Sequence, residues 1–548
     1  LALALVPPAS AQWLESDCVS PLEIEGVDLQ DTFGFVADSV GDVTGDGIGD
    51  IVSAAPLSSL GFGSSGFVRV YDGVTGSVLW TRTGRHTSAI LGFAIRVADW
   101  NGDGVLDVFT SEPFGAGLGG HVWVLSGDDG RVLHEFNPSD VSGDSFGYGI
   151  AVGGDFDGDG VDDVAIGSAG YDPPGLVNAG RVYVYSGATG AQITAIDGPG
   201  IAGGDASFGT GLTFLNDVDG DGRDDLVAGY RDPSFVRGSV RAYGWNGAQA
   251  VELYSVADVG MPSQLFGTYV EGGADVSGDG VGDFVVGDLR EDVADVFSGA
   301  DGALLYTLDG EGQLGGFGSG EIVPDLDGDG LADLILGARS NDAGAQDAGR
   351  IFFYSGRTGT LLRTATHTVA GQRIGLACRW IGDHDGDGAD DYVVAGTGGG
   401  TGGPPLGRLF VLKGAAPFDR FCSATPSSTG QPAYLGAVGR PSVAANELVF
   451  TASPVPTATF GILFYGSGQT QVPLGNGTRC VGGATVRRLP VEQAVGAVWR
   501  HGLDLSRPPA SSLLQPGTHW HFQVWYRDSV AGGAGVDLSD GLSVTFLP

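Results

Sequence analysis

Seven copies of an acidic nonapeptide, which start 50 to 62 residues apart, constrain the fold of this chain more than any other feature. Each copy begins and ends with Asp and carries Gly-Asp-Gly at positions four to six. The copies are DVTGDGIGD (42–50), DWNGDGVLD (99–107), DFDGDGVDD (155–163), DVDGDGRDD (217–225), DVSGDGVGD (275–283), DLDGDGLAD (325–333) and DHDGDGADD (383–391). A period of this length indicates one supersecondary unit repeated along the chain.

Each repeat surrounds its acidic loop with the same segments. A Phe-Gly pair or a close variant precedes the loop, and an apolar strand that ends in small residues follows it, as in VAIGSAG (164–170). A Gly-rich loop and a hairpin, as in GRVYVYSGATGAQITAI (180–196), complete the unit. Four short strands per unit are typical of a propeller blade. The sequence therefore predicts an all-β fold with a seven-bladed β-propeller over residues 12–421.

The two ends of this repeat region complement each other. The last repeat supplies GRLFVLKG (407–414) but lacks a fourth strand, whereas PLEIEG (21–26) precedes the first repeat without a partner. Because an unpaired edge strand promotes aggregation, we expect the N-terminal strand to complete the last blade.

The acidic loops have the ligand pattern of a calcium site. Positions 1, 3, 5 and 9 carry oxygen side chains, position 7 offers its carbonyl, and Gly at position 6 allows a sharp turn. No His or Cys is placed to bind zinc, and Mg²⁺ demands stricter octahedral geometry, so we expect up to seven Ca²⁺ ions. The predicted ligands are Asp42, Thr44, Asp46, Ile48, Asp50, Asp99, Asn101, Asp103, Val105, Asp107, Asp155, Asp157, Asp159, Val161, Asp163, Asp217, Asp219, Asp221, Arg223, Asp225, Asp275, Ser277, Asp279, Val281, Asp283, Asp325, Asp327, Asp329, Leu331, Asp333, Asp383, Asp385, Asp387, Ala389 and Asp391.

The closing residue separates these loops from an EF-hand. Position 12, where an EF-hand has Glu, holds residues of the next strand, so the Asp at position 9 closes the site instead. Thr44, Asn101 and Ser277 each replace a carboxylate, and we expect weaker binding in those three loops. The alternative interpretation is that the Asp-Gly pairs only form turns.

The stretch FGYGIAVGGDFDGDGVDDVAIGSAG (146–170) resembles the FG-GAP repeats of integrin α-subunit propellers and related bacterial proteins. The resemblance covers about residues 22–414. It implies metal loops on the lower face of the ring and a binding surface on the opposite face. Two repeats depart from the pattern, because Leu91 and Ile374 replace the Phe of Phe-Gly. All seven repeats keep the metal loop, whereas integrins keep it in only some blades.

The repeat pattern stops near Cys422. PSSTGQP (426–432) is typical of a linker, and the segments after it alternate like antiparallel strands, so we predict a β-sandwich over residues 422–548. LGNGTRCVGG and FQVWYRD resemble a C-terminal module of secreted proteins from planctomycete-like and myxobacterial lineages. Trp525 and Tyr526 could bind sugar, although aromatic residues that fill a sandwich core explain the same pattern.

Several features indicate export. Residues 1–11 resemble the remnant of a signal peptide with an Ala-Ser-Ala cleavage site, and no run reaches the roughly 18 apolar residues of a membrane span. The four cysteines show no CxxC spacing, and we expect a disulfide between Cys422 and Cys480, with Cys18 and Cys378 paired or free. A formal net charge of −39 disfavours nucleic acid and anionic membranes. We expect a secreted or cell-surface protein.

The sequence leaves three classes of function open. The main hypothesis is a non-catalytic, calcium-binding adhesion scaffold for an extracellular protein or glycan, because the repeats build a rigid ring and no unique motif builds a reaction centre. A lectin-like propeller is the alternative, and a hydrolase or polysaccharide lyase on the same scaffold is a third possibility. Loops that follow the second strands carry the candidate ligand contacts Tyr171, Tyr230, Arg231, Arg290 and Arg339.

Overall fold

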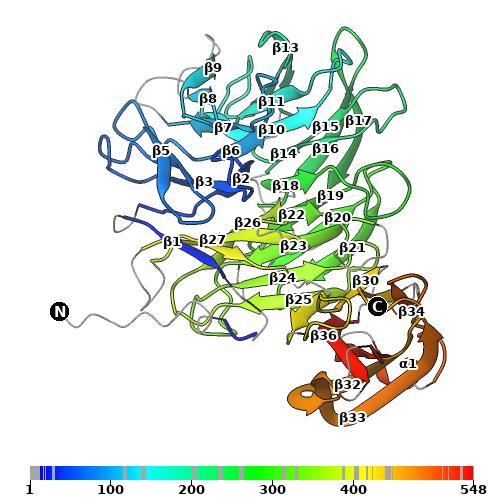
Figure 1. Ribbon diagram of the computed structural model, residues 1–548. Coiled ribbons are helices and arrows are strands. Elements are labelled where there is room, and N and C mark those ends of the chain that lie inside the picture. The colour runs from blue at the N-terminus through cyan, green and yellow to red at the C-terminus, as the bar shows by residue number, and fades with distance from the viewer. Residues whose placement is uncertain are drawn as a thin grey trace. The chain divides into compact units, whose positions relative to one another are not determined.

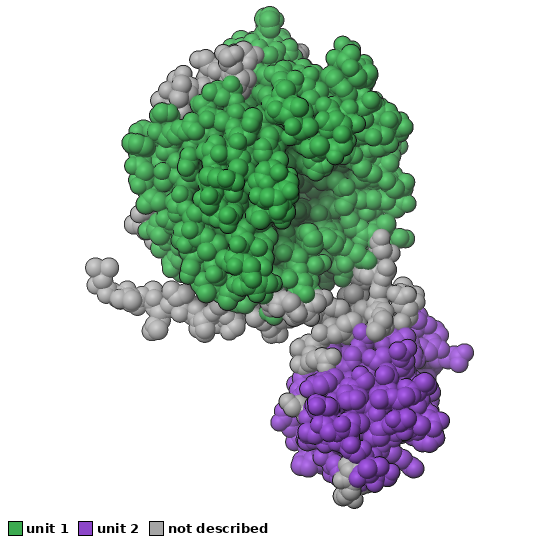
Figure 2. All heavy atoms as spheres, turned by 45° about the horizontal axis from the view of Figure 1, so that its top comes forward, with its two compact units in different colours: residues 1–326, 331–415 green, residues 327–330, 416–548 purple. Residues whose placement is uncertain are grey.

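The computed structural model describes residues 13–15, 18, 20–27, 31–114, 120–137, 144–199, 206–231, 238–257, 265–311, 316–326, 331–384, 389–399, 406–414, 418–422, 424–438, 443, 446, 448–508, 510–515, 518–530 and 535–546 (Figure 1). The segment interpreted as a signal remnant, residues 1–11, lies outside this part of the chain. The chain divides into two compact units (Figure 2). Unit 1 comprises residues 1–326 and 331–415, and unit 2 comprises residues 327–330 and 416–548.

Unit 1 contains seven four-stranded antiparallel sheets among the described residues, and in six of them the strands follow chain order. The first three sheets contain β2 (Ala37–Gly41), β3 (Asp50–Ala55), β4 (Phe67–Tyr71) and β5 (Val78–Thr83); β6 (Ile95–Ala98), β7 (Asp107–Glu112), β8 (His121–Leu125) and β9 (Val132–Phe136); and β10 (Phe146–Gly154), β11 (Asp163–Ser168), β12 (Arg181–Tyr185) and β13 (Gln192–Asp197). The next three contain β14 (Leu212–Leu215), β15 (Asp225–Tyr230), β16 (Ser239–Trp245) and β17 (Ala250–Ala257); β18 (Tyr269–Gly272), β19 (Phe284–Asp288), β20 (Val293–Phe297) and β21 (Leu304–Asp309); and β22 (Phe317–Val323), β23 (Asp333–Ala338), β24 (Arg350–Tyr354) and β25 (Leu361–Thr366).

The seventh sheet joins the two ends of unit 1. It consists of β26 (Ile374–Gly382), β27 (Asp391–Gly396), β28 (Arg408–Leu412) and the N-terminal strand β1 (Leu22–Glu25). Leu22 of β1 lies opposite Val411 of β28, and Ile24 lies opposite Leu409. The prediction that the N-terminal strand completes the last blade is confirmed.

The sheets form a closed ring. The first strand of each sheet contacts the first strand of the next sheet along the chain, and β26 of the last sheet contacts β2 of the first. The first strands therefore surround the centre of the ring, while the fourth strands lie at its outer edge and expose many residues. The all-β class and the propeller architecture are confirmed.

The core of unit 1 lies between neighbouring sheets. Seven hydrophobic clusters each combine buried residues of two adjacent sheets. The second strands are buried along nearly their whole length. The second strands end in small residues because the next sheet lies close to them. A Cβ on Gly167, for example, would lie 1.9 Å from the carbonyl oxygen of Gly209 in the Phe-Gly pair of the next sheet. The Phe-Gly pair and the small residue therefore belong to one interface between sheets.

Unit 2 is a β-sandwich. One sheet has the order β29 (Phe418–Phe421), β36 (Val536–Thr545), β35 (His519–Arg527), β32 (Phe460–Leu474) and β33 (Gly477–Gln493). The other contains β30 (Tyr434–Val438), β31 (Val449–Ser453) and β34 (Trp499–Gly502), and the single described helix, α1, spans only Ala510–Leu513. Both sheets contribute to one core that includes Phe450, Trp499 and Phe522.

Of the two predicted sugar contacts of unit 2, Tyr526 is buried and Trp525 is half-buried. Tyr526 is fully buried in the main core, and Trp525 packs against a smaller cluster around Phe464. This arrangement agrees with the interpretation that the aromatic residues of this strand fill the sandwich core, rather than with a sugar site.

The predicted linker at residues 426–432 is wrong, because this segment is a turn inside unit 2. Pro426 and Pro432 form a β-bridge, and the backbone N–H of Ser428 donates to a carboxylate oxygen of Asp528 at 2.6 Å. β29 begins at Phe418 and pairs with β36. The predicted boundary between residues 421 and 422 is therefore too late, because β29 already belongs to the sheet of the C-terminal unit.

Candidate metal centre in the acidic loops

Each acidic loop connects the first and second strands of its sheet, and its last Asp starts the second strand in six sheets and directly precedes it in the fifth. Asp163 is fully buried and accepts hydrogen bonds from the backbone N–H groups of Phe156 and Asp157, at 2.9 and 3.1 Å. Its second oxygen accepts from Gly187, which follows the third strand, at 2.9 Å. The position-9 carboxylate therefore fixes the loop to its own sheet.

The first Asp organises the loop from inside. Asp155 accepts from the backbone N–H groups of Gly158, Asp159 and Gly160 at 2.8 to 3.0 Å. Gly160, at position 6, has a φ of +89°, in the left-handed region where a side chain would strain the backbone. The predicted role of this glycine in a sharp turn is confirmed.

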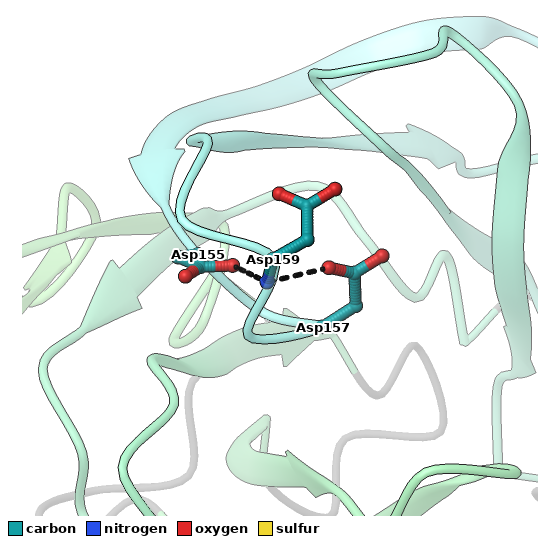
Figure 3. A group of neighbouring side chains, drawn as sticks. All are labelled: Asp155, Asp157 and Asp159. Carbon is teal, nitrogen blue, oxygen red and sulfur yellow. Dashed lines mark hydrogen bonds between the residues drawn. The ribbon is translucent and has the colours of Figure 1, made fainter.

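In two loops the carboxylates at positions 1, 3 and 5 converge. Asp155, Asp157 and Asp159 each present an oxygen within 4.8 Å of the other two, and Asp159 donates its backbone N–H to both neighbours (Figure 3). Asp217, Asp219 and Asp221 form an equivalent group in the next loop. The predicted ligands Asp327, Asp329, Asp385 and Asp387 lie outside the described residues.

Loops in which Thr or Ser replaces the Asp at position 3 keep the hydrogen bonds from backbone N–H groups to the first Asp. Asp42 accepts from the N–H groups of Gly45 and Gly47, both at 2.7 Å, and Asp275 accepts from Gly278 and Gly280 at 2.5 and 2.8 Å. In both loops the hydroxyl at position 3 donates to the first Asp, from Thr44 and Ser277 at 3.3 Å. A hydroxyl therefore lies where the third position of other loops has a carboxylate.

The closing carboxylates have raised pKa values. Burial raises the pKa of Asp107 and of Asp163 to about 6. The pKa of Asp225 rises to about 7, mainly through burial and also through the charges of Asp219 and Asp221. Burial and the charge of Asp159 raise the pKa of Asp157 as well. Burial therefore disfavours the ionised form of these closing carboxylates, whereas the hydrogen bond from the backbone N–H of Gly47 lowers the pKa of Asp42 at position 1 of the first loop.

The residues of the fourth loop fit a hard cation. One carboxylate oxygen of Asp217 and one of Asp225 are buried without a hydrogen-bond partner among the described residues. An unpaired buried acceptor is costly, whereas a cation such as Ca²⁺ prefers several oxygen ligands. His384, at position 2 of the seventh loop, instead turns toward Gly73 O, which lies 3.2 Å from its Nε2.

The position-12 residues lie where the sequence predicts them. All seven are in the second strands of their sheets and are buried. They are Ser53, Thr110, Ile166, Ala228, Val286, Leu336 and Val394.

Arg223 was predicted as a ligand only through its carbonyl, but its side chain has a separate role. Its Nη1 lies 2.7 Å from a carboxylate oxygen of Asp221, and its Nε donates to Asp157 O in the third loop at 3.2 Å. Arg223 therefore already neutralises part of the charge at position 5 of the fourth loop. A charged residue inside an acidic repeat is the only sequence signal for this contact.

The five candidate ligand contacts lie at the end of their sheets opposite the acidic loops and are distributed over four sheets. Tyr171 and Tyr230 each pack beneath an arginine, Arg181 at 3.9 Å and Arg241 at 5.5 Å from the ring centres. Arg231 donates to the hydroxyl of Ser207 at 3.2 Å, and Arg290 is exposed. Arg339 is half-buried beside Arg373, and burial, together with that second charge, lowers the pKa of Arg339.

Sequence analysis missed an aromatic cluster at this same end of the sheets. Phe93 lies 5.7 Å from Phe35, 5.6 Å from Phe114 and 4.8 Å from Tyr148 between ring centres. Phe35, Phe93 and Tyr148 each follow the Phe-Gly position of the first three repeats, and Phe114 is 40% exposed. The sequence signal for this cluster was an aromatic residue directly after Phe-Gly, or after its variant, in three successive repeats.

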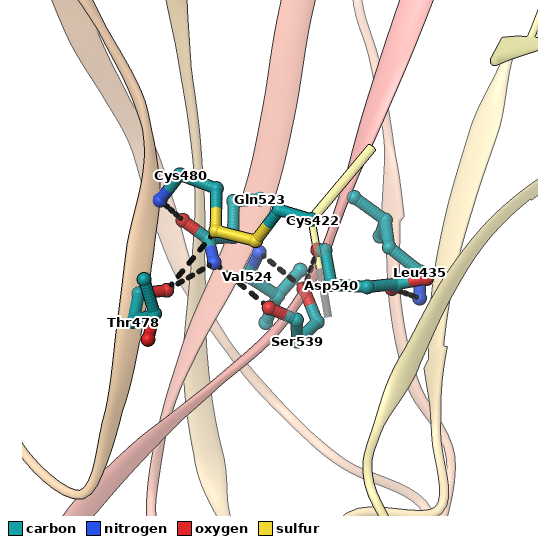
Figure 4. Close-up of a disulfide and its surroundings, with 8 residues drawn as sticks. All are labelled: Cys422, Leu435, Thr478, Cys480, Gln523, Val524, Ser539 and Asp540. Atoms are coloured by element: carbon teal, nitrogen blue, oxygen red, sulfur yellow. Dashed lines mark hydrogen bonds between the residues drawn. A yellow bond between two sulfur atoms is a disulfide. The ribbon is translucent and has the colours of Figure 1, made fainter. Parts of the chain in front are cut away.

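The predicted disulfide is confirmed. Cys422 and Cys480 are bonded, with their Cα atoms 6.3 Å apart (Figure 4). Gln523 lies beside the bond, accepts from the backbone N–H of Cys480 at 2.9 Å and donates to Thr478 O and Ser539 O at 2.8 Å. Cys18 and Cys378 take no part in the disulfide and are both buried in one hydrophobic cluster of unit 1.

Parts of this chain are similar in sequence to known proteins. Residues 146–185 and 317–354 match the FG-GAP repeat, and residues 42–110 match the FG-GAP-like repeat. Integrin alpha-V of Gallus gallus is 31% identical over 210 residues, which are 35% of this chain and 19% of that protein. Integrin alpha-PS2 of Drosophila melanogaster is 31% identical over 226 residues, 38% of this chain and 16% of that protein.

A relative of another kind shares the repeats. Phosphatidylinositol-glycan-specific phospholipase D of Bos taurus is 33% identical over 158 residues, 25% of this chain and 18% of that protein. The matches thus cover less than a quarter of each of these relatives. No helix in the described part of the chain is long and apolar enough to cross a membrane. With its acidic loops, four-stranded sheets and matched segments, the chain contains FG-GAP repeats and resembles integrin α chains over part of its length.

Proposed function

We propose that this protein is a calcium-stabilised extracellular binding scaffold without catalytic activity, and that its seven sheets are the blades of a seven-bladed propeller. The observation that carries the proposal is the acidic loop: three carboxylates converge in the third and fourth loops, and two carboxylate oxygens of the fourth loop are buried without a partner among the described residues. Calcium suits this set of oxygen ligands, and its free concentration outside cells matches the weak affinities of extracellular modules. The disulfide in unit 2 supports an oxidising location.

A metal count and thermal unfolding test the calcium part of the proposal. Purified protein in millimolar calcium is expected to carry several Ca²⁺ ions and to lose thermal stability in chelator, and Mg²⁺ should restore little of the loss. A count near zero together with an unchanged melting temperature would refute calcium binding.

The ligand is an extracellular protein or glycan that binds at the end of the sheets opposite the acidic loops. This end carries the aromatic cluster of Phe35, Phe93, Phe114 and Tyr148, as well as Arg231 and Arg339. Aromatic and Arg side chains are enriched at binding hot spots. With a ligand identified, Phe93→Ala combined with Phe114→Ala should weaken binding, and so should Arg231→Ala combined with Arg339→Ala. Unchanged affinity in both variants would place the site elsewhere.

The aromatic cluster also favours the lectin-like alternative, because sugar rings stack on exposed aromatic side chains. A glycan array distinguishes a glycan from a protein as the ligand: binding that is lost in the Phe93→Ala variant supports a lectin, and an empty array supports a protein ligand. The phospholipase activity in the name of one relative belongs to that protein. Turnover of ester or polysaccharide substrates by this purified chain would contradict the non-catalytic proposal.

A further inference from the structure

The first strands place seven equivalent residues at one level around the centre of unit 1. Each lies opposite the residue two positions after the last Asp of the acidic loop in its own sheet, for example Asp38 opposite Val52 and Glu321 opposite Ile335. In sheet order the seven residues are Asp38, Arg96, Ala151, Thr213, Glu271, Glu321 and Arg379. We call this set the channel ring. Five of its seven positions are charged, although the first strands are otherwise mostly uncharged.

Ion pairs cross the centre of the ring. Glu271 accepts from Arg96 and from Arg379, both at 2.6 Å and both at the same carboxylate oxygen. Arg379 also donates to Gly320 O, on the adjacent sheet, at 2.9 Å. The side chains of Glu271 and Arg379 are each only 13% exposed. One carboxylate thereby joins the second, fifth and seventh sheets.

The two other carboxylates of the channel ring have no ion pair within the described part of the chain. Asp38 accepts from the backbone N–H of Ser39, and Glu321 accepts from the backbone N–H of Trp380, both at 2.8 Å. The ring thus contains three carboxylates and two guanidinium groups, and both guanidinium groups are already bound to Glu271. When every group is ionised, the ring carries one uncompensated negative charge.

Burial raises the free-energy cost of that uncompensated negative charge. It raises the pKa of Glu321 to about 7 against the opposing effect of Arg379, with further increases from Asp38 and Glu271. Burial also raises the pKa of Asp38, which Arg379 and Arg96 oppose. The remaining titratable groups near these carboxylates are Tyr269, on the same strand as Glu271, and the thiol of Cys378, and burial raises the pKa of both. Ala151 and Thr213 add no charge.

We propose that the channel ring is a proton-dependent clamp, in which one proton taken up at Glu321 neutralises the ring and tightens the sheets around their centre. The proton adds to a carboxylate oxygen of Glu321, and no other bond changes. Because the folded state holds this proton more tightly than the unfolded chain does, the stabilisation is complete below the ordinary pKa of 4.5 and is lost as the pH rises through about 7. Mild acid should therefore strengthen the ring while it protonates the carboxylates of the acidic loops.

The test is the substitution Glu321→Gln, which fixes the side chain in its neutral form. Melting temperatures of variant and wild type are compared in saturating calcium at about pH 5.5 and about pH 8. Since the comparison is made at one pH at a time, the calcium loops contribute equally to both proteins. The variant should melt above the wild type by a small margin at the lower pH, where most of the stabilisation remains, and this margin should widen by about 2 °C or more at the higher pH.

Glu252→Gln is the matched control, because Glu252 pairs with Arg241 at 2.6 Å on the outer strand β17 and is exposed. Its effect on the melting temperature should be the same at both pH values. Asp38→Asn provides a second variant within the ring and should also raise the melting temperature at the higher pH. If the Glu321→Gln effect does not change with pH, or if both ring variants melt below the wild type at the higher pH, the clamp does not exist.

Discussion

At the residue scale, the Asp residues of an acidic loop have two separate roles. Asp163 accepts three backbone N–H bonds and is fully buried, whereas Asp159 is exposed and accepts from the N–H group of Val161 alone at 2.9 Å. Position 9 therefore maintains the fold of the sheet, and position 5 is available to a cation. Sequence analysis treated both positions as equivalent ligands, because hydrogen bonds to the backbone leave no trace in residue type.

This division predicts different calcium dependences for two alanine variants. Asp163→Ala leaves buried N–H groups unpaired and should destabilise the protein by about 3 kcal/mol or more, both in calcium and in chelator. Asp159→Ala should cost about 1.4 kcal/mol when calcium is at ten times its dissociation constant, and close to nothing in chelator. Thermal unfolding of both variants in the two buffers measures the difference. A calcium-independent loss in Asp159→Ala would show that position 5 acts on the fold alone.

At the element scale, β1 is the strand on which ring closure depends. Leu22 and Ile24 are buried in the cluster that joins the seventh sheet to the first, while Val27, just beyond the strand, is 56% exposed. Farther toward the N-terminus, Glu15 accepts from the hydroxyls of Thr364 and Thr366 at 2.8 and 2.7 Å. The N-terminal segment thus contacts both the sixth and the seventh sheets.

Ile24→Asp should therefore open the ring, because it places an unpaired carboxylate in the core and costs about 3 kcal/mol or more. We expect a larger hydrodynamic radius or aggregation in size-exclusion chromatography, together with faster proteolysis. Val27→Asp is the matched control and should behave as the wild type does. A soluble, protease-resistant Ile24→Asp monomer would count against closure by β1, and so would a well-folded protein that lacks residues 12–27.

The disulfide is the corresponding constraint in unit 2. It links β33 to the end of β29 across a sequence separation of 58 residues. In the chain-entropy description, a loop of that length contributes about 4 kcal/mol to stability. The double variant Cys422→Ser, Cys480→Ser should lower the melting transition of unit 2 and leave that of unit 1 unchanged. Calorimetry resolves the two transitions, and a shift in both would show that the units unfold together.

The elements that the sequence predicted are those with local signals. Phe-Gly, the acidic loop and the hairpin predicted the four strands of each sheet, and the apolar segment 21–26 predicted closure. The turn at residues 426–432 was not predicted, because Pro, Ser and Gly are common to linkers and to turns. Its contact with Asp528, a hundred residues away in the chain, has no local signal.

At the scale of the whole molecule, the fold brings together charged residues that lie far apart in the sequence. Arg96, Glu271 and Arg379 form one network although 175 and 108 residues separate the two arginines from Glu271 in the chain. Finding this network requires the register of seven strands at once, which no single repeat contains. The acidic loops, in contrast, recur with the repeat and were therefore visible in the sequence.

The last prediction concerns calcium and the stability of the whole ring. The chain has a formal net charge of −39, and each empty loop holds carboxylates whose mutual repulsion opposes folding. At ten times a typical dissociation constant, each independent Ca²⁺ site adds about 1.4 kcal/mol, so seven sites add about 10 kcal/mol. That contribution is comparable to the total stability of about 5 to 15 kcal/mol of an ordinary domain. Chelation should therefore lower the melting temperature of unit 1 far more than any of the single substitutions above, and it should leave that of unit 2 unchanged. Calorimetry in millimolar calcium, in magnesium and in chelator measures both transitions, and equal transitions in all three buffers would show that the loops are only turns.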